Sequence, residues 1–174
     1  MGLLDHFHAD HEPANPAEAT FLGKTAPLRS GDQTNGLYKA ERLWRSASRG
    51  GKSIGIGAAR DLIGEIVHSK QAENFPGIEK VREAYKPENI QLMRRDEIGG
   101  IAATHKSGLM RFSPTGLTLG AVTHEASHLL HQGQFGHDWP MARAHGYLAH
   151  HFIGTEDAKA LGEAYARGGI DLGK

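Results

Sequence analysis

The residues with the clearest potential for chemistry are His124, Glu125 and His128, which form an H-E-x-x-H motif within an apolar stretch. On an α-helix, residues four apart are separated by about 40° around the axis and about 6 Å along it. The two imidazoles would therefore project from one helix face and could bind one metal ion. The carboxylate of Glu125 could accept a proton from a water molecule at that metal. The motif thus supplies two ligands and a general base.

The surrounding residues favour a helix that is buried in the protein core. Apolar side chains lie on both sides of the motif, and unpaired His or Glu would be costly among them. These apolar residues are Leu117, Leu119, Val122, Leu129 and Leu130. The alternative interpretation is an amphipathic helix that carries its histidines on the surface. We expect Ser113 or Thr115 as the N-cap of this helix and an end near Gly133 or Gly136.

A catalytic zinc site requires a third protein ligand and an open position for water. His137 is the first candidate, because it follows the motif by nine residues and can fold back once the motif helix has ended. Asp138, beside it, is an alternative ligand. Glu156 or Glu163 would instead match a pattern in which a carboxylate from a later helix completes the site. His131 is excluded because it extends the same helix away from the ion.

Composition limits the class of protein and the kind of partner. The chain of 174 residues is long enough for one core and one domain. It has 20 Lys plus Arg and 20 Asp plus Glu, so no overall field favours nucleic acid or anionic lipid. There is no cysteine, which leaves a metal site to histidine and carboxylate ligands. Neither a membrane-spanning stretch nor a signal-peptide pattern is present, so we expect a cytoplasmic protein with no membrane partner.

The pattern of polar and apolar residues predicts an α+β fold. Residues 1–34, which are rich in proline and polar residues, should form a poorly ordered N-terminal arm before a single domain at 35–174. Helical spacing predicts helices at 36–48, 58–74, 141–152 and 155–169 and a short helical turn within 77–85. Alternating patterns predict strands at 89–94, 100–105 and 109–112, with a hairpin turn at 106–108. We expect these three strands to form an antiparallel sheet.

Several stretches resemble a zinc metallohydrolase family of actinobacteria and their phages, which is itself similar to SprT-like zincins. They are the run at 38–41, the hairpin before the motif, the H-E-x-x-H motif, the His137 loop and the tail at 154–170. The resemblance covers roughly residues 32–171 in order. It implies a minimal zincin-like core with Zn²⁺ on His124, His128 and His137 and with Glu125 as the general base.

Two features depart from that family. Asp138 and Met141 stand where a small residue and a bulky aromatic residue are expected after the third histidine. The Cys-rich zinc ribbon of many SprT-like proteins is also absent, so the DNA-linked role of some of them is not carried over.

These observations together predict a zinc-dependent metallohydrolase, a metalloprotease whose motif helix packs with further helices against the small sheet. Glu125 would take the proton of the attacking water and deliver it to the leaving amine of a peptide or protein substrate. Residues 109–112 would lie at the sheet edge, where an extended substrate could add as a further strand. Arg143, His145 and Tyr147 are unranked candidates for stabilising the oxyanion.

There are two alternatives. One is a non-catalytic binding or structural protein that uses the metal only to hold its helices together. The other is a nucleic-acid-associated protease that contacts phosphates through a basic stripe of Arg42, Arg45, Arg49 and Lys52. A solvated helix face is the simpler interpretation of this stripe for a chain of zero net charge, so we expect no nucleic-acid partner.

Overall fold

The structure is a computed structural model, and it describes residues 32–98, 100–105, 107–132 and 136–173. Most of the arm predicted at 1–34 lies outside these residues, and its last three residues belong to the first described helix. The described chain forms seven α-helices and three short strands, so the predicted α+β class is confirmed. No described helix is both long and apolar enough to cross a membrane.

The helices are α2 (Asp32–Ala47), α3 (Ile56–His68), α4 (Ile78–Ala84), α5 (Arg95–Ile98), α6 (Leu119–Leu130), α7 (Trp139–Phe152) and α8 (Thr155–Arg167). Single 3-10 turns occur at η3 (Arg49–Gly51), η4 (Gln71–Asn74) and η5 (Pro87–Asn89). The strands are β1 (Ile90–Leu92), β2 (Ala102–Thr104) and β3 (Met110–Phe112). The predicted helices are therefore present, with the second one ending at His68 instead of residue 74 because Ser69 bonds back to the carbonyl of Ile66.

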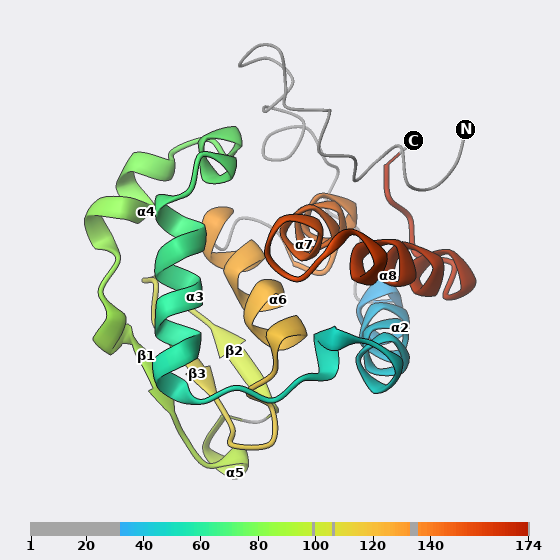
Figure 1. The fold of residues 1–174 in the computed structure, drawn as a ribbon, viewed down its shortest axis with the longest axis horizontal. Helices are drawn as coiled ribbons and strands as arrows, with labels where there is room; N and C mark the ends of the chain where they lie inside the picture. Colours follow the sequence, from blue (N-terminus) through green and yellow to red (C-terminus); the bar gives the residue numbers. More distant parts are fainter. Residues whose placement is uncertain (1–31, 99, 106, 133–135, 174) are drawn as a thin grey trace.

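Helix α6, which carries the H-E-x-x-H motif, lies between α3 and α7 and beside β2 (Figure 1). One hydrophobic cluster fills the space between α3, α4, the sheet and α6, and includes Ile63, Val67, Phe75, Phe112, Val122 and Leu130. A second cluster joins α2, α7 and α8, and includes Leu37, Trp44, Met141, Leu161 and Tyr165. The motif helix is therefore fixed in the middle of the molecule, as the buried-helix interpretation predicts.

The prediction of an antiparallel sheet is wrong, because the sheet is mixed and its strand order is β1-β3-β2. Strand β3 runs antiparallel to β2 but parallel to β1, with Ile90 opposite Met110. The segment between β1 and β2 contains α5 instead of a tight turn, so the chain can cross to the far side of β3. Strand β3 is consequently central, and the prediction that residues 109–112 form a sheet edge is also wrong.

The N-cap of the motif helix is Thr118 and not Ser113 or Thr115. The hydroxyl of Thr118 accepts a hydrogen bond from the backbone N–H of Ala121 at 3.2 Å. Ser113 instead closes the preceding turn, where its hydroxyl accepts from the N–H of Gly116. The two residues have the same capping chemistry, so only the three-dimensional path of the chain distinguishes them. The predicted end near Gly133 or Gly136 is also too late, since α6 ends at Leu130.

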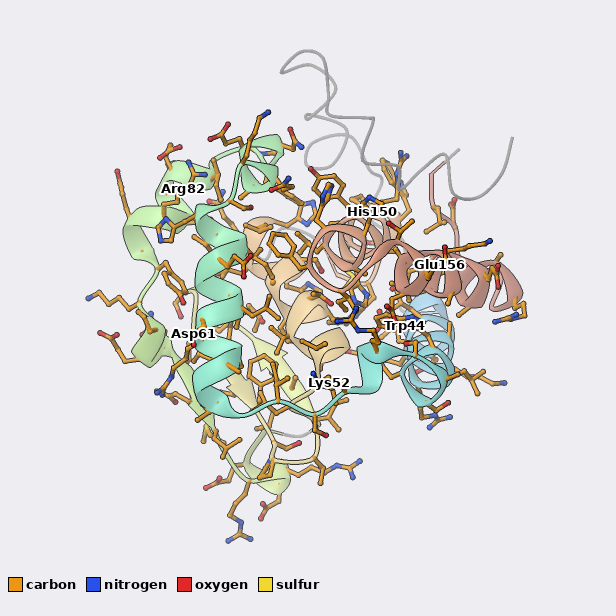
Figure 2. The ribbon with its side chains drawn as sticks, in the orientation of Figure 1. Trp44, Lys52, Asp61, Arg82, His150 and Glu156 are labelled. Atoms are coloured by element: carbon orange, nitrogen blue, oxygen red, sulfur yellow. The ribbon has the colours of Figure 1, made fainter. Side chains whose placement is uncertain are left out.

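The junction between α2 and α6 depends on two glycines that pack against one indole. Trp44 is buried where α2 and α8 lie side by side, and its Nε1 donates to the carbonyl of Asp157 at 2.9 Å (Figure 2). A methyl group on Gly120 would lie 2.7 Å from the ring of Trp44 and 2.9 Å from the carbonyl oxygen of Gly50. The added methyl group would lie between the indole of Trp44 and the backbone of η3. Neither neighbour can move away easily, so the overlap would persist.

We therefore expect Gly120→Ala to lower the free energy of unfolding by about 1–3 kcal/mol in urea denaturation. Gly57→Ala is the matched control, since Gly57 also lies in a helix but has no atom within 4 Å of the added methyl group. That control should be neutral or slightly stabilising, because alanine is the better helix former. Equal stability of the two variants would contradict the packing described here.

Candidate metal centre

Three histidines converge beside α6. His124 and His128 project from one face of the helix, one turn apart, and His137 comes from the segment between α6 and α7. The Nε2 atom of His137 lies 3.3 Å from Nε2 of His124 and 3.3 Å from Nε2 of His128. These three residues form a group whose ligand atoms all lie within 4.8 Å of one another. The structure thus brings together the three ligands predicted from the sequence.

The separations match the requirements of a zinc ion. Two nitrogen ligands at about 2.0–2.1 Å from a tetrahedral zinc lie about 3.3–3.4 Å apart. Burial lowers the pKa of His128 to about 2 and that of His137 to about 4. Both imidazoles are therefore neutral near pH 7, which is the form that binds a metal. The donor set and its spacing fit zinc with one position left for water or substrate.

The alternative ligands lie outside this group. Asp138 is buried immediately before α7, while Glu156 and Glu163 are exposed on α8, where Figure 2 labels the first of them. His131 contacts the carbonyl oxygen of Ser127 through Nδ1 at 2.9 Å and packs edge-on against Phe75. None of these four side chains belongs to a potential metal-binding group among the described residues.

The carboxylate of Glu125 is held beside the cluster by the sheet. Thr104, at the end of β2, donates its hydroxyl proton to Oε2 of Glu125 at 2.6 Å. Only 6% of Glu125 is exposed, and this burial raises the pKa of its carboxyl, although His124 and Thr104 oppose the shift. A carboxylate in such surroundings is a better proton acceptor than one in water.

His124 is oriented by a buried carboxylate that the sequence analysis did not single out. Its Nδ1 lies 2.8 and 2.9 Å from the two carboxylate oxygens of Glu41 on α2. A proton on Nδ1 in this bond leaves the lone pair of Nε2 directed at His128 and His137. Carboxylate–histidine pairs of this kind fix the tautomer and the ring plane of metal-binding histidines.

Glu41 is itself held by several polar groups. The hydroxyl of Tyr165 donates to its Oε1 at 2.7 Å, His145 approaches the same oxygen at 3.0 Å, and Arg45 lies 3.6 Å from Oε2. Burial alone would raise the pKa of the Glu41 carboxyl, but His124 and His145 hold it well below its usual range. Glu41 is therefore an ionised carboxylate with no exposed surface.

A second group with metal-ligand chemistry comprises Glu41, His124 and His145. All three side chains are buried, and their short contacts are accounted for by shared protons. The other ring nitrogen of His145 lies 3.1 Å from the hydroxyl of Thr123. We interpret this group as the support of the first cluster and not as another metal site.

The three residues predicted to stabilise an oxyanion form hydrogen bonds within the protein. Of the three, His145 packs edge-on against His124. His145 is fully buried behind Glu41. The hydroxyl of Tyr147 accepts a hydrogen bond from Asn74 at 2.8 Å, and Arg143 donates to the carbonyl oxygen of Gly173 at 3.2 Å. The predicted basic stripe is not one exposed surface either, since only 15% of the Arg45 side chain is exposed.

The aromatic residue that does contact the cluster is Tyr38 on α2. Its ring centroid lies 4.6 Å from that of His137 and 5.8 Å from that of His124, with which it stacks. Burial raises the pKa of Tyr38 to about 12, and the charges of Glu125 and Glu41 add to the shift. The hydroxyl is therefore protonated near neutral pH.

Comparison with protein-family models, with curated proteins and with solved structures finds no match to the chain. The interpretation of the site therefore rests on the geometry of its own residues.

The sequence contained a usable signal for Glu41. On α2 the apolar Leu43 is 60% exposed, while the charged Glu41 is completely buried. Glu41 follows Leu37 by four residues and precedes Trp44 by three, so helical spacing alone would have assigned it to the buried face. A lone carboxylate at such a position indicates a cationic or hydrogen-bonding partner in the core.

The ligand choice can be tested by two neighbouring substitutions. His137→Ala should weaken zinc affinity by more than about 100-fold, because removal of a ligand costs more than loss of a supporting contact. Asp138→Ala should weaken zinc affinity less than His137→Ala does. Affinities would be measured by competition with a chromophoric chelator. The reverse ranking would assign the ligand to Asp138, and normal binding by both variants would direct attention to Glu156 and Glu163.

The supporting role of Glu41 makes a separate prediction. Glu41→Gln should reduce zinc affinity about 10 to 100-fold, since the amide cannot compensate for partial positive charge on His124. Tyr165→Phe is the matched comparison, because it removes one hydrogen bond from Glu41 without touching His124, and it should cost less affinity. Unfolding of both metal-free proteins would be followed by circular dichroism, and wild-type affinity in a folded Glu41→Gln protein would refute the role.

Proposed function

We propose that the protein is a zinc-dependent metallohydrolase that cleaves peptide bonds, built on a minimal zincin-like domain. The observation that supports this most strongly is the convergence of three imidazoles, with Nε2 of His137 at 3.3 Å from Nε2 of both His124 and His128, beside the buried carboxylate of Glu125. His124, His128 and His137 would hold the ion. Purely structural zinc sites have four protein ligands, whereas three histidines leave a position open.

Zinc bound by these histidines would act as a Lewis acid and lower the pKa of a water molecule. Glu125 accepts the proton of the attacking water and then donates it to the nitrogen of the leaving amine. Thr104 holds one oxygen of this carboxylate and fixes its direction. Glu41 keeps the Nδ1 proton on His124, so that its Nε2 remains available as a ligand.

The substrate is expected to bind along β2. This strand is at an edge of the sheet, and its last residue, Thr104, contacts Glu125. An extended peptide can add to an edge strand through main-chain hydrogen bonds, and this would bring its backbone close to the general base. The edge strand for substrate addition is therefore β2 instead of residues 109–112.

A cavity beside this edge offers space for a substrate side chain. It has a volume of about 240 Å³ and lies between α4, the β2–β3 hairpin and the end of α6. Leu129 lines it, one helical turn after Glu125 on the same face of α6, and His105 lines it directly after Thr104. With Val81 on the third side, the cavity suits an apolar side chain near the scissile bond.

The decisive variant is Glu125→Gln, because an amide of nearly the same shape cannot accept the proton. Wild type and variant should both hold about one zinc ion per chain by elemental analysis, while hydrolysis of unfolded casein should fall at least about 100-fold in the variant. Glu88→Gln, an exposed substitution in η5, is the matched control and should leave both properties unchanged.

Three results would count against the proposal. If the wild-type protein binds no zinc when zinc is supplied, the proposed metal centre is refuted. If Glu125→Gln keeps full activity, the proposed role of Glu125 as general base is refuted. Zinc binding without chelator-sensitive hydrolysis would favour the alternative of a protein that uses the metal only for structure.

A further inference from the structure

Tyr38 and Glu41 are presented to the site by the same face of α2, three residues apart. Glu41 lies behind His124 with no exposed surface, whereas Tyr38 is 42% exposed at the rim of the cluster. Its ring stacks on His124 at an interplanar angle of 21° and packs against His137 at a centroid distance of 4.6 Å. One helix therefore supports the ligands from behind and also borders the side where a substrate would enter.

The hydroxyl of Tyr38 differs from those of the other three tyrosines. Tyr85 donates to the carbonyl of Arg60, Tyr165 donates to Glu41, and Tyr147 accepts from Asn74. Within residues 32–98, 100–105, 107–132 and 136–173, the Tyr38 hydroxyl has no hydrogen-bond partner, although its ring is held by two histidines. A donor that has no hydrogen-bond partner in the described part of the chain, next to three candidate metal ligands, is arranged to meet a ligand.

We propose that Tyr38 is a catalytic residue whose hydroxyl donates a hydrogen bond to the carbonyl oxygen of the scissile peptide bond as negative charge develops there. This inference rests on the proposed function. The water oxygen forms a bond to the carbonyl carbon, and the C–N bond then breaks. The proton taken up by Glu125 goes to the leaving nitrogen, while Tyr38 keeps its own proton throughout. Its contribution is stabilisation of charge and not proton transfer.

Tyr38 is better placed to stabilise an oxyanion than the three residues predicted from the sequence. His145 is buried behind Glu41, the hydroxyl of Tyr147 is bonded to Asn74, and Nη1 of Arg143 is bonded to the carbonyl oxygen of Gly173. Tyr38 alone among these four has its ring in contact with two of the predicted ligands. Because Tyr38 is also 42% exposed, its hydroxyl can meet a carbonyl oxygen that approaches the three histidines from solvent.

The test is Tyr38→Phe in the zinc-loaded full-length protein, with acetohydroxamate as the probe. The hydroxamate binds metal through oxygen atoms that can also accept a hydrogen bond from a tyrosine. We expect its dissociation constant, measured by isothermal titration calorimetry, to rise about 10 to 100-fold in the variant, as for loss of a hydrogen bond to a charged group. Zinc affinity should stay within about twofold, because phenylalanine preserves the ring contacts.

Kinetics with unfolded casein provide the second measurement. Tyr38→Phe should lower kcat about 100-fold with little change in KM, since the lost hydrogen bond strengthens only as charge develops. Tyr147→Phe is the matched control: it removes a hydroxyl that accepts a hydrogen bond from Asn74, and both measurements should match wild type.

The outcomes separate this inference from the proposed function. If Glu125→Gln abolishes hydrolysis but Tyr38→Phe keeps wild-type kcat and hydroxamate affinity, the metallohydrolase stands and the role of Tyr38 is refuted. If Tyr38→Phe instead weakens zinc binding, the residue is a positioning contact for the histidines and the proposal is overturned. If the wild-type protein binds neither zinc nor acetohydroxamate, both conclusions fail together.

Discussion

The contact between Glu41 and His124 is the interaction on which the rest of the structure depends. A carboxylate without exposed surface is costly unless charge and hydrogen bonds compensate for its loss of water. The compensation comes from His124 on α6, His145 on α7 and Tyr165 on α8, with Arg45 nearby on α2 itself. Four helices therefore meet at one charge, and any shift of one helix would leave that charge partly unpaired. The contacts that hold these helices together are therefore the same contacts that orient the imidazole of His124.

The same contact explains how a small sheet and a set of helices can build an ordered site. Hydrophobic packing on either side of α6 determines where the motif lies, but apolar contacts are not directional and cannot fix the rotation of an imidazole ring. The polar contacts supply that direction. Glu41 acts on one side of His124, Thr104 acts on Glu125, and the ring of Tyr38 limits the space available to His137.

Much of this site could be predicted from the sequence because helix geometry converts spacing into position. The four-residue interval of His124 and His128 required a shared face, and His137 followed the end of a helix closely enough to return to it. The topology of the sheet was harder to predict from the sequence. Strands of three residues show little alternation of polar and apolar side chains, and the segment at α5 gave no sign that the chain crosses over β3. Glu41 was missed for another reason: a charged residue on a helix is usually solvated, and its partners lie 83 to 124 residues away.

That separation has a consequence for how the protein is made. The hydroxyl of Tyr165 reaches Glu41 across 124 residues of chain, and His145 does so across 104. A nascent chain that has released α2 and α6 from the ribosome already contains His124 and Arg45, but it lacks His145 and Tyr165, the other two groups that compensate for the buried carboxylate of Glu41. The full set of contacts around Glu41 can therefore form only when α7 and α8 have docked. Contacts of high sequence separation slow folding, so we expect the orientation of His124 to be fixed late.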